Sequence, residues 1–270
     1  MHRRIAVLVG VVLVTAALLP LPLDRARPMD DESVFVKGLG PDEDESILYI
    51  WTRDGDGAES DFLAVVDADP ESETYGEIIA TEPTGSAGNE AHHFGYTVDT
   101  DRIFAGGMFS NRLFIYDVAT DPRDPELIRT VDLDPTGYSG PHTLYAVPGG
   151  VMIAMLGATD GGGPGGLVVL DDDGNLIEAQ PQAGHPGVPE YMYDVGVKPE
   201  MDRMITSAWA HPQHVKMKGG SPPGETGNEI VVWSWEDREI LQVVELDLAP
   251  LEVRWLHGPD GLGGFINCAY

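Results

Sequence analysis

Three histidines occupy similar places in two hydrophobic segments, and together they could bind a metal ion. His92 and His93 open the segment that runs to Val98, and His142 opens the segment that runs to Val147. Counting back from these valines aligns His93 with His142, which predicts imidazoles at equivalent positions of two structural units. Imidazole nitrogens that converge from distant parts of a chain suit transition metals. The alternative, which the sequence leaves open, is that each histidine is a surface or hydrogen-bonded residue.

Two carboxylates fall near the same level in later segments of the chain. Counted in the same way, Asp194 and Glu252 lie within a residue or two of the position that His142 has in its own segment. A carboxylate near a metal-binding histidine commonly accepts the second ring N–H and fixes the orientation of the imidazole. Asp194 and Glu252 are therefore candidates for residues that orient the ligands.

The elements that carry these residues form a repeat of roughly 50 to 60 residues, a spacing within the range of propeller blades. Each unit has two predicted hairpins, rich in β-branched and aromatic residues and closed by short turns. The first kind pairs 62–67 with 76–81, 113–117 with 126–131, 167–171 with 176–178, and 230–234 with 239–244. The second kind pairs 93–98 with 102–105, 142–147 with 151–154, 193–197 with 203–206, and 252–256 with 264–267.

Two hairpins per unit give four strands, so the sequence predicts an all-β fold, a β-propeller with about four blades in residues 46–270. A β-sandwich with similar hairpins is the alternative. The innermost strands of a propeller line its central channel, which would bring His93 and His142 together from different blades. Because a closed ring pairs its last blade with its first, we expect the ring to be incomplete here or to be completed by a second polypeptide.

The first 45 residues differ in character from the predicted propeller. Residues 1–26 are predicted to be a signal peptide or an N-terminal membrane anchor, because basic residues precede a nearly continuous apolar run over 5–23. Residues 27–45 are predicted to be an acidic linker. Both alternatives predict an exported protein: periplasmic or extracellular, or tethered through residues 5–23 to the outer face of the cytoplasmic membrane.

The composition is strongly acidic, with 45 Asp and Glu against 16 Lys and Arg and a formal net charge of −29. Such a surface repels phosphate backbones, so we expect no nucleic-acid partner. The negative charge is spread through the chain and favours a solvated surface that resists association. Cys268 is the only cysteine, which excludes an intrachain disulfide, and we expect its side chain to be buried as a small apolar group.

Four motifs, in the same order along the chain, resemble those of the selenium-binding protein / methanethiol oxidase family. Glu90–Tyr96 (EAHHFGY) is similar to E-x-H-H-x-G-W/Y, and Arg112–Val118 (RLFIYDV) is similar to S-R-I-Y-V-V-D-V. Gly150–Gly157 (GVMIAMLG) resembles V-M-I-S-x-L-G-D, and Pro250–Asp260 (PLEVRWLHGPD) resembles P-L-E-I-R-F-L-H-x-P-D. The resemblance extends over nearly all of the chain after residue 46.

The resemblance implies a seven-bladed propeller that, in exported bacterial members, uses copper to oxidise methanethiol with O2 and water to formaldehyde, hydrogen sulfide and hydrogen peroxide. It also implies that His92, His93 and His142 are metal ligands. Two positions depart from the family pattern. Tyr145 replaces the second histidine of H-T-x-H, which makes it a candidate neighbour of the metal. Gly76 replaces the cysteine linked to selenium, so we expect no selenium binding by that route.

These observations favour an exported copper-dependent oxidase of small thiols, because copper accepts a soft thiolate ligand. One alternative is a non-catalytic binding module, or a truncated relative that needs a partner to close the ring. Another is a calcium-dependent propeller hydrolase, which would suit Asp194 and Glu252 but not the paired histidines.

Overall fold

The computed structural model describes residues 46–180, 189–209, 211–215, 226–256 and 261–269. The predicted signal peptide or anchor at 1–26 and the predicted linker at 27–45 lie outside these residues. Within the described ranges, no helix has both the length and the apolar character that crossing a bilayer requires.

The strands of the described ranges form five antiparallel sheets. Sheet A contains β1 (Ile47–Thr52), β2 (Phe62–Asp67) and β3 (Ile78–Pro83). Sheet B contains β4 (Ala91–Tyr96), β5 (Arg102–Gly107), β6 (Arg112–Asp117) and β7 (Glu126–Asp132). Sheet C contains β8 (Tyr138–Val147), β9 (Gly150–Ala158), β10 (Gly166–Asp171) and β11 (Leu176–Gln180). Sheet D contains β12 (Asp194–Lys198), β13 (Arg203–Ser207), β14 (Glu229–Trp233) and β15 (Ile240–Glu245), and sheet E contains β16 (Ala249–Trp255) and β17 (Gly264–Ala269). The short helical elements are η1 (Asp134–Thr136), η2 (Pro199–Met201) and α1 (Pro212–Val215).

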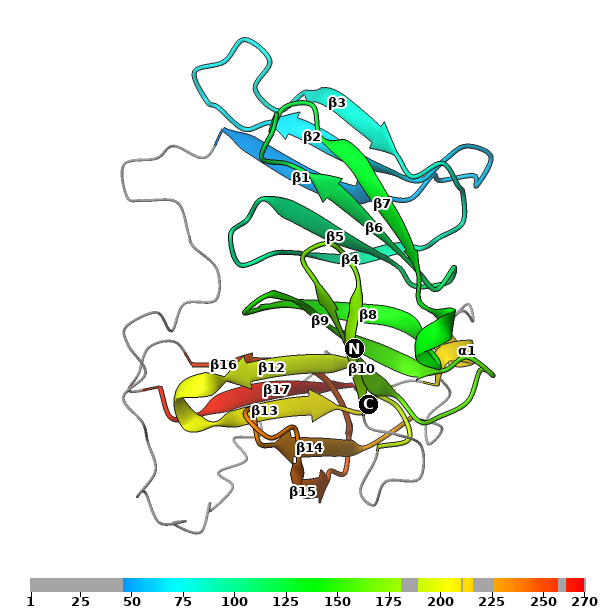
Figure 1. The fold of residues 1–270 in the computed structure, drawn as a ribbon, viewed down its shortest axis with the longest axis vertical. Coiled ribbons are helices and arrows are strands. Elements are labelled where there is room, and N and C mark those ends of the chain that lie inside the picture. Colours follow the sequence, from blue (N-terminus) through cyan, green and yellow to red (C-terminus); the bar gives the residue numbers. More distant parts are fainter. Residues whose placement is uncertain (1–45, 181–188, 210, 216–225, 257–260, 270) are drawn as a thin grey trace, which may run out of the picture.

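The sheets follow one another as the blades of a propeller do. Figure 1 shows sheets A, B, C and D arranged in chain order from top to bottom. In sheets B, C and D the four strands are neighbours in sequence order, so each sheet is one complete blade. The first strands β4, β8, β12 and β16 contact one another in succession, as innermost strands do. The prediction of an all-β propeller with about four blades' worth of strands is confirmed, and the sandwich alternative is wrong.

The predicted hairpins of both kinds are present, and one strand was not predicted. β1 lies ahead of the first predicted hairpin and pairs with β2 over its whole length. Since β2 corresponds in the repeat to β6, β10 and β14, sheet A contains the second, third and fourth strands of a blade. The alternating sequence ILYIWT is typical of a strand, but in the described part of the chain no first strand pairs with it.

Apolar side chains fill the spaces between neighbouring sheets. Alternate residues of the middle strands face opposite neighbours: on β9, Ile153 packs toward sheet B and Met152 packs toward sheet D. A third cluster, which includes Trp51 and Phe114, joins sheets A and B. Each large side chain that is fully buried contributes about 1.5–3 kcal/mol. Burial between successive sheets from A to D, on both faces of sheets B and C, therefore holds these sheets together without a disulfide.

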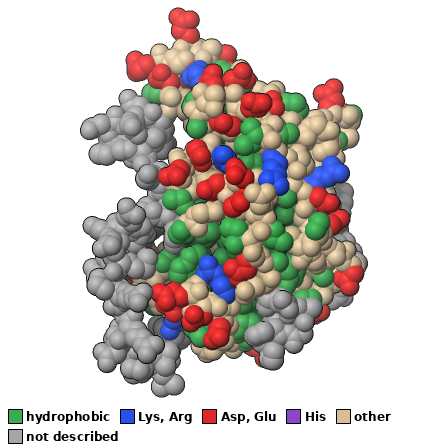
Figure 2. Space-filling view, viewed as in Figure 1, with side chains coloured by type: hydrophobic (Ala, Val, Ile, Leu, Met, Phe, Trp, Pro, Cys, Tyr) green, Lys and Arg blue, Asp and Glu red, His purple; other side chains and the backbone are tan. Residues whose placement is uncertain are grey.

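The charged surface follows the composition. Acidic side chains are scattered over the face that Figure 2 shows and do not gather in one patch. Some of the few arginines form ion pairs between sheets: Arg123 of sheet B lies 3.0 Å from the buried Asp67 of sheet A, and Arg102 of sheet B lies 2.7 Å from Asp173 beside sheet C. The pair with Asp173 contributes little to stability, because exposed ion pairs contribute about 0–1 kcal/mol. Arg123 instead gives a buried carboxylate a donor from the neighbouring sheet.

The expectation that Cys268 is buried is wrong. The thiol is exposed on β17, which pairs only with β16 in the described part of the chain. An edge strand covers fewer of its side chains than the central strand of a blade does.

Gly95 allows the innermost strands of sheets B and C to approach closely. A Cβ atom at this position would lie 2.8 Å from the carbonyl oxygen of Leu144 on β8, a separation that the two backbones cannot tolerate without moving. We expect Gly95→Ala to lower the free energy of unfolding by about 1–3 kcal/mol, as overpacking of a core does. Urea unfolding measures the change.

The matched control is Gly55→Ala, since a Cβ atom at Gly55 would meet nothing within 4 Å. If both variants unfolded at the same urea concentration, the close approach of β4 and β8 would not be a constraint on the fold.

Candidate metal centre

The histidines lie at a β-bulge that recurs in successive innermost strands. In β4, His92 and His93 together oppose the single residue Gly106 of β5. In β8, His142 and Thr143 oppose the single residue Ala154 of β9. A bulge of this kind interrupts the alternation of side chains and re-aims the two residues that it contains.

The same irregularity continues around the inner edge. In β16, Leu251 and Glu252 oppose the single residue Asn267 of β17. Sheet D differs, because Asp194 already pairs with Ser207 of β13 in a regular register and Tyr193 lies directly before it. The site therefore consists of residues from one level of four neighbouring blades.

This register corrects the alignment made from the sequence. His92, not His93, is equivalent to His142, because each is the first residue of its bulge. The count from Val98 and Val147 was wrong by one residue because β4 ends at Tyr96, and Val98 belongs to the following turn. His93 is instead equivalent to Thr143.

The three imidazoles lie against one another. The Nε2 atoms of His92 and His142 are 3.0 Å apart, and the ring of His93 lies 4.4 Å, centroid to centroid, from each of the other two rings. One ligand nitrogen from each histidine can be chosen so that all three lie within 4.8 Å of one another. His142 is buried, His93 is partly buried and His92 is exposed, so the cluster opens to solvent on the side of β4.

Burial keeps these imidazoles neutral. It lowers the pKa of His142 well below its ordinary value, and the neighbouring His93 and His92 lower it further. Burial and His92 lower the pKa of His93 to about 4, and burial lowers that of His92, with Glu90 acting in the opposite direction. All three rings are therefore neutral at neutral pH. A neutral imidazole has one nitrogen without a proton, and this is the form that binds metal.

The donor set fits a transition metal. Metal–imidazole bonds of about 2.0–2.1 Å in a tetrahedral site place ligand nitrogens about 3.3 Å apart. The pair formed by His92 and His142 is already near that separation, and ligand atoms of all three histidines lie within 4.8 Å of one another. Three imidazoles suit copper, zinc, iron or nickel and are poor ligands for calcium.

Of the three predicted neighbours, Asp194 is the one tied to a histidine. Its carboxylate is fully buried and accepts a hydrogen bond of 2.5 Å from Thr143, whose Oγ1 lies 3.2 Å from His142 Nδ1. Glu252 accepts a hydrogen bond of 2.8 Å from Arg254, and burial followed by the charge of Asp194 raises its pKa. Asp194 therefore reaches the cluster through a hydroxyl group, whereas Glu252 pairs with a guanidinium.

Tyr145 contacts the next blade. Its hydroxyl donates to the carbonyl oxygen of Val197 on β12 at 3.4 Å, and its ring packs against the apolar cluster between sheets C and D. Burial raises the pKa of the Tyr145 hydroxyl, so the phenol stays protonated at neutral pH. Its packing makes Tyr145 part of the contact between blades C and D.

Tyr193, which no sequence pattern singled out, covers His142 with its ring. The ring centroids of Tyr193 and His142 are 3.7 Å apart, with the planes inclined by 35°. Trp209 packs edge-on against Tyr193, with ring centroids 4.9 Å apart. Burial raises the pKa of Tyr193, and the charges of Glu252 and Asp194 raise it further. Its position directly before Asp194 was the available signal.

Gly76 lies away from the innermost strands, in the turn that leads into β3. Its φ angle is +81°, and a Cβ atom there would meet nothing within 4 Å. A cysteine would fit the space but would adopt a left-handed backbone conformation that favours glycine. The local backbone thus agrees with the absence of the family cysteine.

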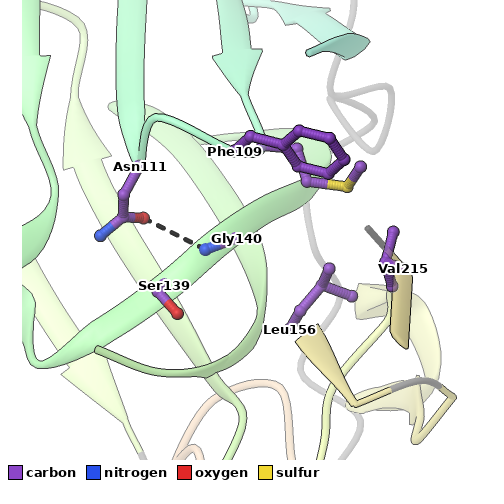
Figure 3. Close-up of a pocket in the computed structure, with 7 residues that line it drawn as sticks. Phe109, Asn111, Ser139, Gly140, Leu156 and Val215 are labelled. Atoms are coloured by element: carbon purple, nitrogen blue, oxygen red, sulfur yellow. Dashed lines mark hydrogen bonds between the residues drawn. The ribbon is translucent and has the colours of Figure 1, made fainter. Parts of the chain in front are cut away.

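A cavity of about 50 Å³ lies between sheets B and C beside α1. Figure 3 shows its lining, including a hydrogen bond of 3.2 Å from the Gly140 N–H to Asn111 Oδ1. Its residues are Met108, Phe109, Asn111, Ser139, Gly140, Leu156 and Val215. None of these side chains titrates, so the cavity offers space for a small group but no acid–base chemistry.

Fold and site together define a β-propeller protein with a histidine cluster on neighbouring innermost strands. The model of the 56 kDa selenium-binding protein family (SBP56) matches residues 37–270, and the chain belongs to this family. The resemblance stated from the motifs is confirmed.

Curated relatives carry the name methanethiol oxidase. The chain is 35% identical over 227 residues to the protein from Hyphomicrobium sp., an alignment that covers 80% of this chain and 52% of the relative. It is 34% identical to the protein from Ruegeria pomeroyi, with 83% and 57% covered, and 32% identical to the human protein, with 85% and 53% covered. The chain spans about half the length of these relatives.

A crystal structure of a hypothetical selenium-binding protein from Sulfolobus tokodaii has a similar fold. The TM-score is 0.74 at 28% sequence identity, and the match covers 83% of this chain and 54% of that one. The similarity supports the propeller architecture over most of the chain.

We expect His93 of the metal-free protein to titrate near pH 4 rather than near its ordinary value of 6.5. Because the pKa is lower in the folded state, the unfolded chain binds more protons between these two values, and stability falls as the pH drops from about 6.5 to about 4. Histidine ring chemical shifts measured against pH give the midpoint directly.

His93→Gln removes the titrating group and should make the unfolding free energy less dependent on pH in that window. A His93 midpoint at 6.5 or above would contradict the buried, neutral cluster.

Proposed function

We propose that this chain provides the copper-binding part of an exported oxidase of small thiols, of the methanethiol oxidase type. The observation that carries the proposal is the convergence of His92, His93 and His142, unprotonated at neutral pH, on one level of two neighbouring blades. The names of the curated relatives support the reaction type. The apolar run over residues 5–23, preceded by basic residues, supports export or tethering to the outer face of the membrane.

The proposed reaction converts methanethiol, O2 and water to formaldehyde, hydrogen sulfide and hydrogen peroxide. The carbon atom loses two electrons, and O2 gains them to become peroxide, so the equation balances. Copper bound by the three histidines would supply a soft site for the thiolate sulfur and a redox couple between thiol and oxygen.

The chain's own residues prepare this site in three ways. His142 is held by packing against Tyr193 and by the bulge of β8. The exposed side of the cluster, at His92, leaves an approach for a small substrate. The neighbouring phenol of Tyr193 stays protonated because burial and nearby carboxylates raise its pKa, so it is a potential donor to an anionic ligand.

We expect the purified chain to retain about one copper ion per molecule after loading and desalting. His142→Ala removes the most buried imidazole and should weaken copper binding at least about tenfold, because three ligands become two. Metal analysis and release of hydrogen sulfide from methanethiol under oxygen are the measurements. His214→Ala, on α1, is the matched control and should behave like the wild type.

Copper that stayed at the wild-type level in His142→Ala would contradict the proposed ligand set. Copper binding without thiol oxidation would limit the chain to metal binding.

A second candidate function is a non-catalytic module whose ring is completed by a second polypeptide. The observation in its favour is the exposure of large apolar side chains on sheets A and E: Leu48 is 52% exposed, Ile50 43% and Phe265 61%. Such side chains commonly mark contact surfaces. The loading experiment separates the two candidates, because this one expects the wild-type chain alone to retain no copper.

A further inference from the structure

The carboxylate of Asp194 accepts four hydrogen bonds from three blades. Its Oδ1 accepts from the Thr143 hydroxyl at 2.5 Å and from the Val195 main-chain N–H at 2.9 Å. Its Oδ2 accepts from the Val253 main-chain N–H at 2.6 Å and from Arg254 Nη1 at 2.9 Å. The side chain is fully buried, so these partners satisfy it in place of water.

The chemistry of these partners fixes the direction of the hydrogen bond with Thr143. Main-chain N–H groups and a guanidinium can only donate, so both oxygens of Asp194 act as acceptors. The single hydroxyl proton of Thr143 therefore points to Asp194. The carbonyl oxygen of Tyr193 lies 3.5 Å from Thr143 Oγ1, too far to compete with a contact of 2.5 Å.

The tautomer of His142 follows from that direction. With its own proton committed, Thr143 Oγ1 can only accept from His142 Nδ1, which lies 3.2 Å away. Nδ1 therefore carries the ring proton, and Nε2 carries the lone pair. That lone pair faces His92 Nε2 at 3.0 Å, inside the histidine cluster.

We propose that Thr143 and Asp194 form a hydrogen-bond relay that holds His142 in the Nδ1–H tautomer and presents its Nε2 as the ligand atom. Thr143 is a positioning residue in this account, because it acts through His142. The relay begins on β8, passes through β12 and ends on β16, so it ties the ligand to two further blades. Its role in copper binding rests on the proposed function, whereas the tautomer is a property of the metal-free chain.

The test compares Thr143→Val, which removes the hydroxyl from a strand residue of similar shape, with Thr143→Ser, which keeps it. Two-bond ¹H–¹⁵N spectra of the metal-free, ¹⁵N-histidine-labelled protein report which His142 nitrogen is protonated. We expect Nδ1–H in the wild type and in Thr143→Ser, and a mixture of tautomers in Thr143→Val. Copper(II) affinity, measured by chelator competition, should fall about 10- to 100-fold in Thr143→Val and recover in Thr143→Ser.

A wild-type His142 protonated on Nε2 would overturn the inference, and this spectrum requires no variant to fold. A Thr143→Val protein with wild-type spectrum and affinity would overturn it as well. If the wild type bound no copper, the proposed function would fail, but the spectra would still decide the tautomer.

Discussion

The repeated β-bulge on the innermost strands is the constraint on which the site depends. In a regular strand, consecutive side chains point to opposite faces, and His92 and His93 would be separated by the sheet. The bulge in β4 places two residues opposite one, and the rings of these two histidines lie 4.4 Å apart. The same bulge in β8 brings His142 to the same level. A local irregularity, repeated by blade, thus becomes a cluster of imidazoles.

The surrounding blades keep this level in place by two kinds of contact. Apolar clusters fill the spaces between sheets, and close backbone approach at Gly95 joins β4 to β8. The buried carboxylate of Asp194 then links β8, β12 and β16 through hydrogen bonds. In a chain with 45 acidic and 16 basic residues, pairing Arg254 with Asp194 places a scarce positive charge beside a buried negative one.

Much of the fold follows from the sequence, because strand periodicity and turn residues recur with each blade. The one-residue register of the site does not, since the composition does not mark where each strand ends: Val147 is the last residue of β8, whereas Val98 lies in the turn after β4. For this reason the sequence aligned His93 with His142, although His92 is the equivalent residue. Thr143 and Tyr193 were missed because their roles depend on partners from neighbouring blades. Strand β1 was missed because no first strand precedes it among the residues that the structure describes.

The central claim is that His92, His93 and His142 bind one metal ion between two blades. Anomalous diffraction from crystals of the copper-loaded protein, measured above and below the copper absorption edge, tests it most directly. We predict one strong peak within bonding distance of a nitrogen of each of the three histidines. A peak held by other residues, or no peak at this level of the innermost strands, would contradict it.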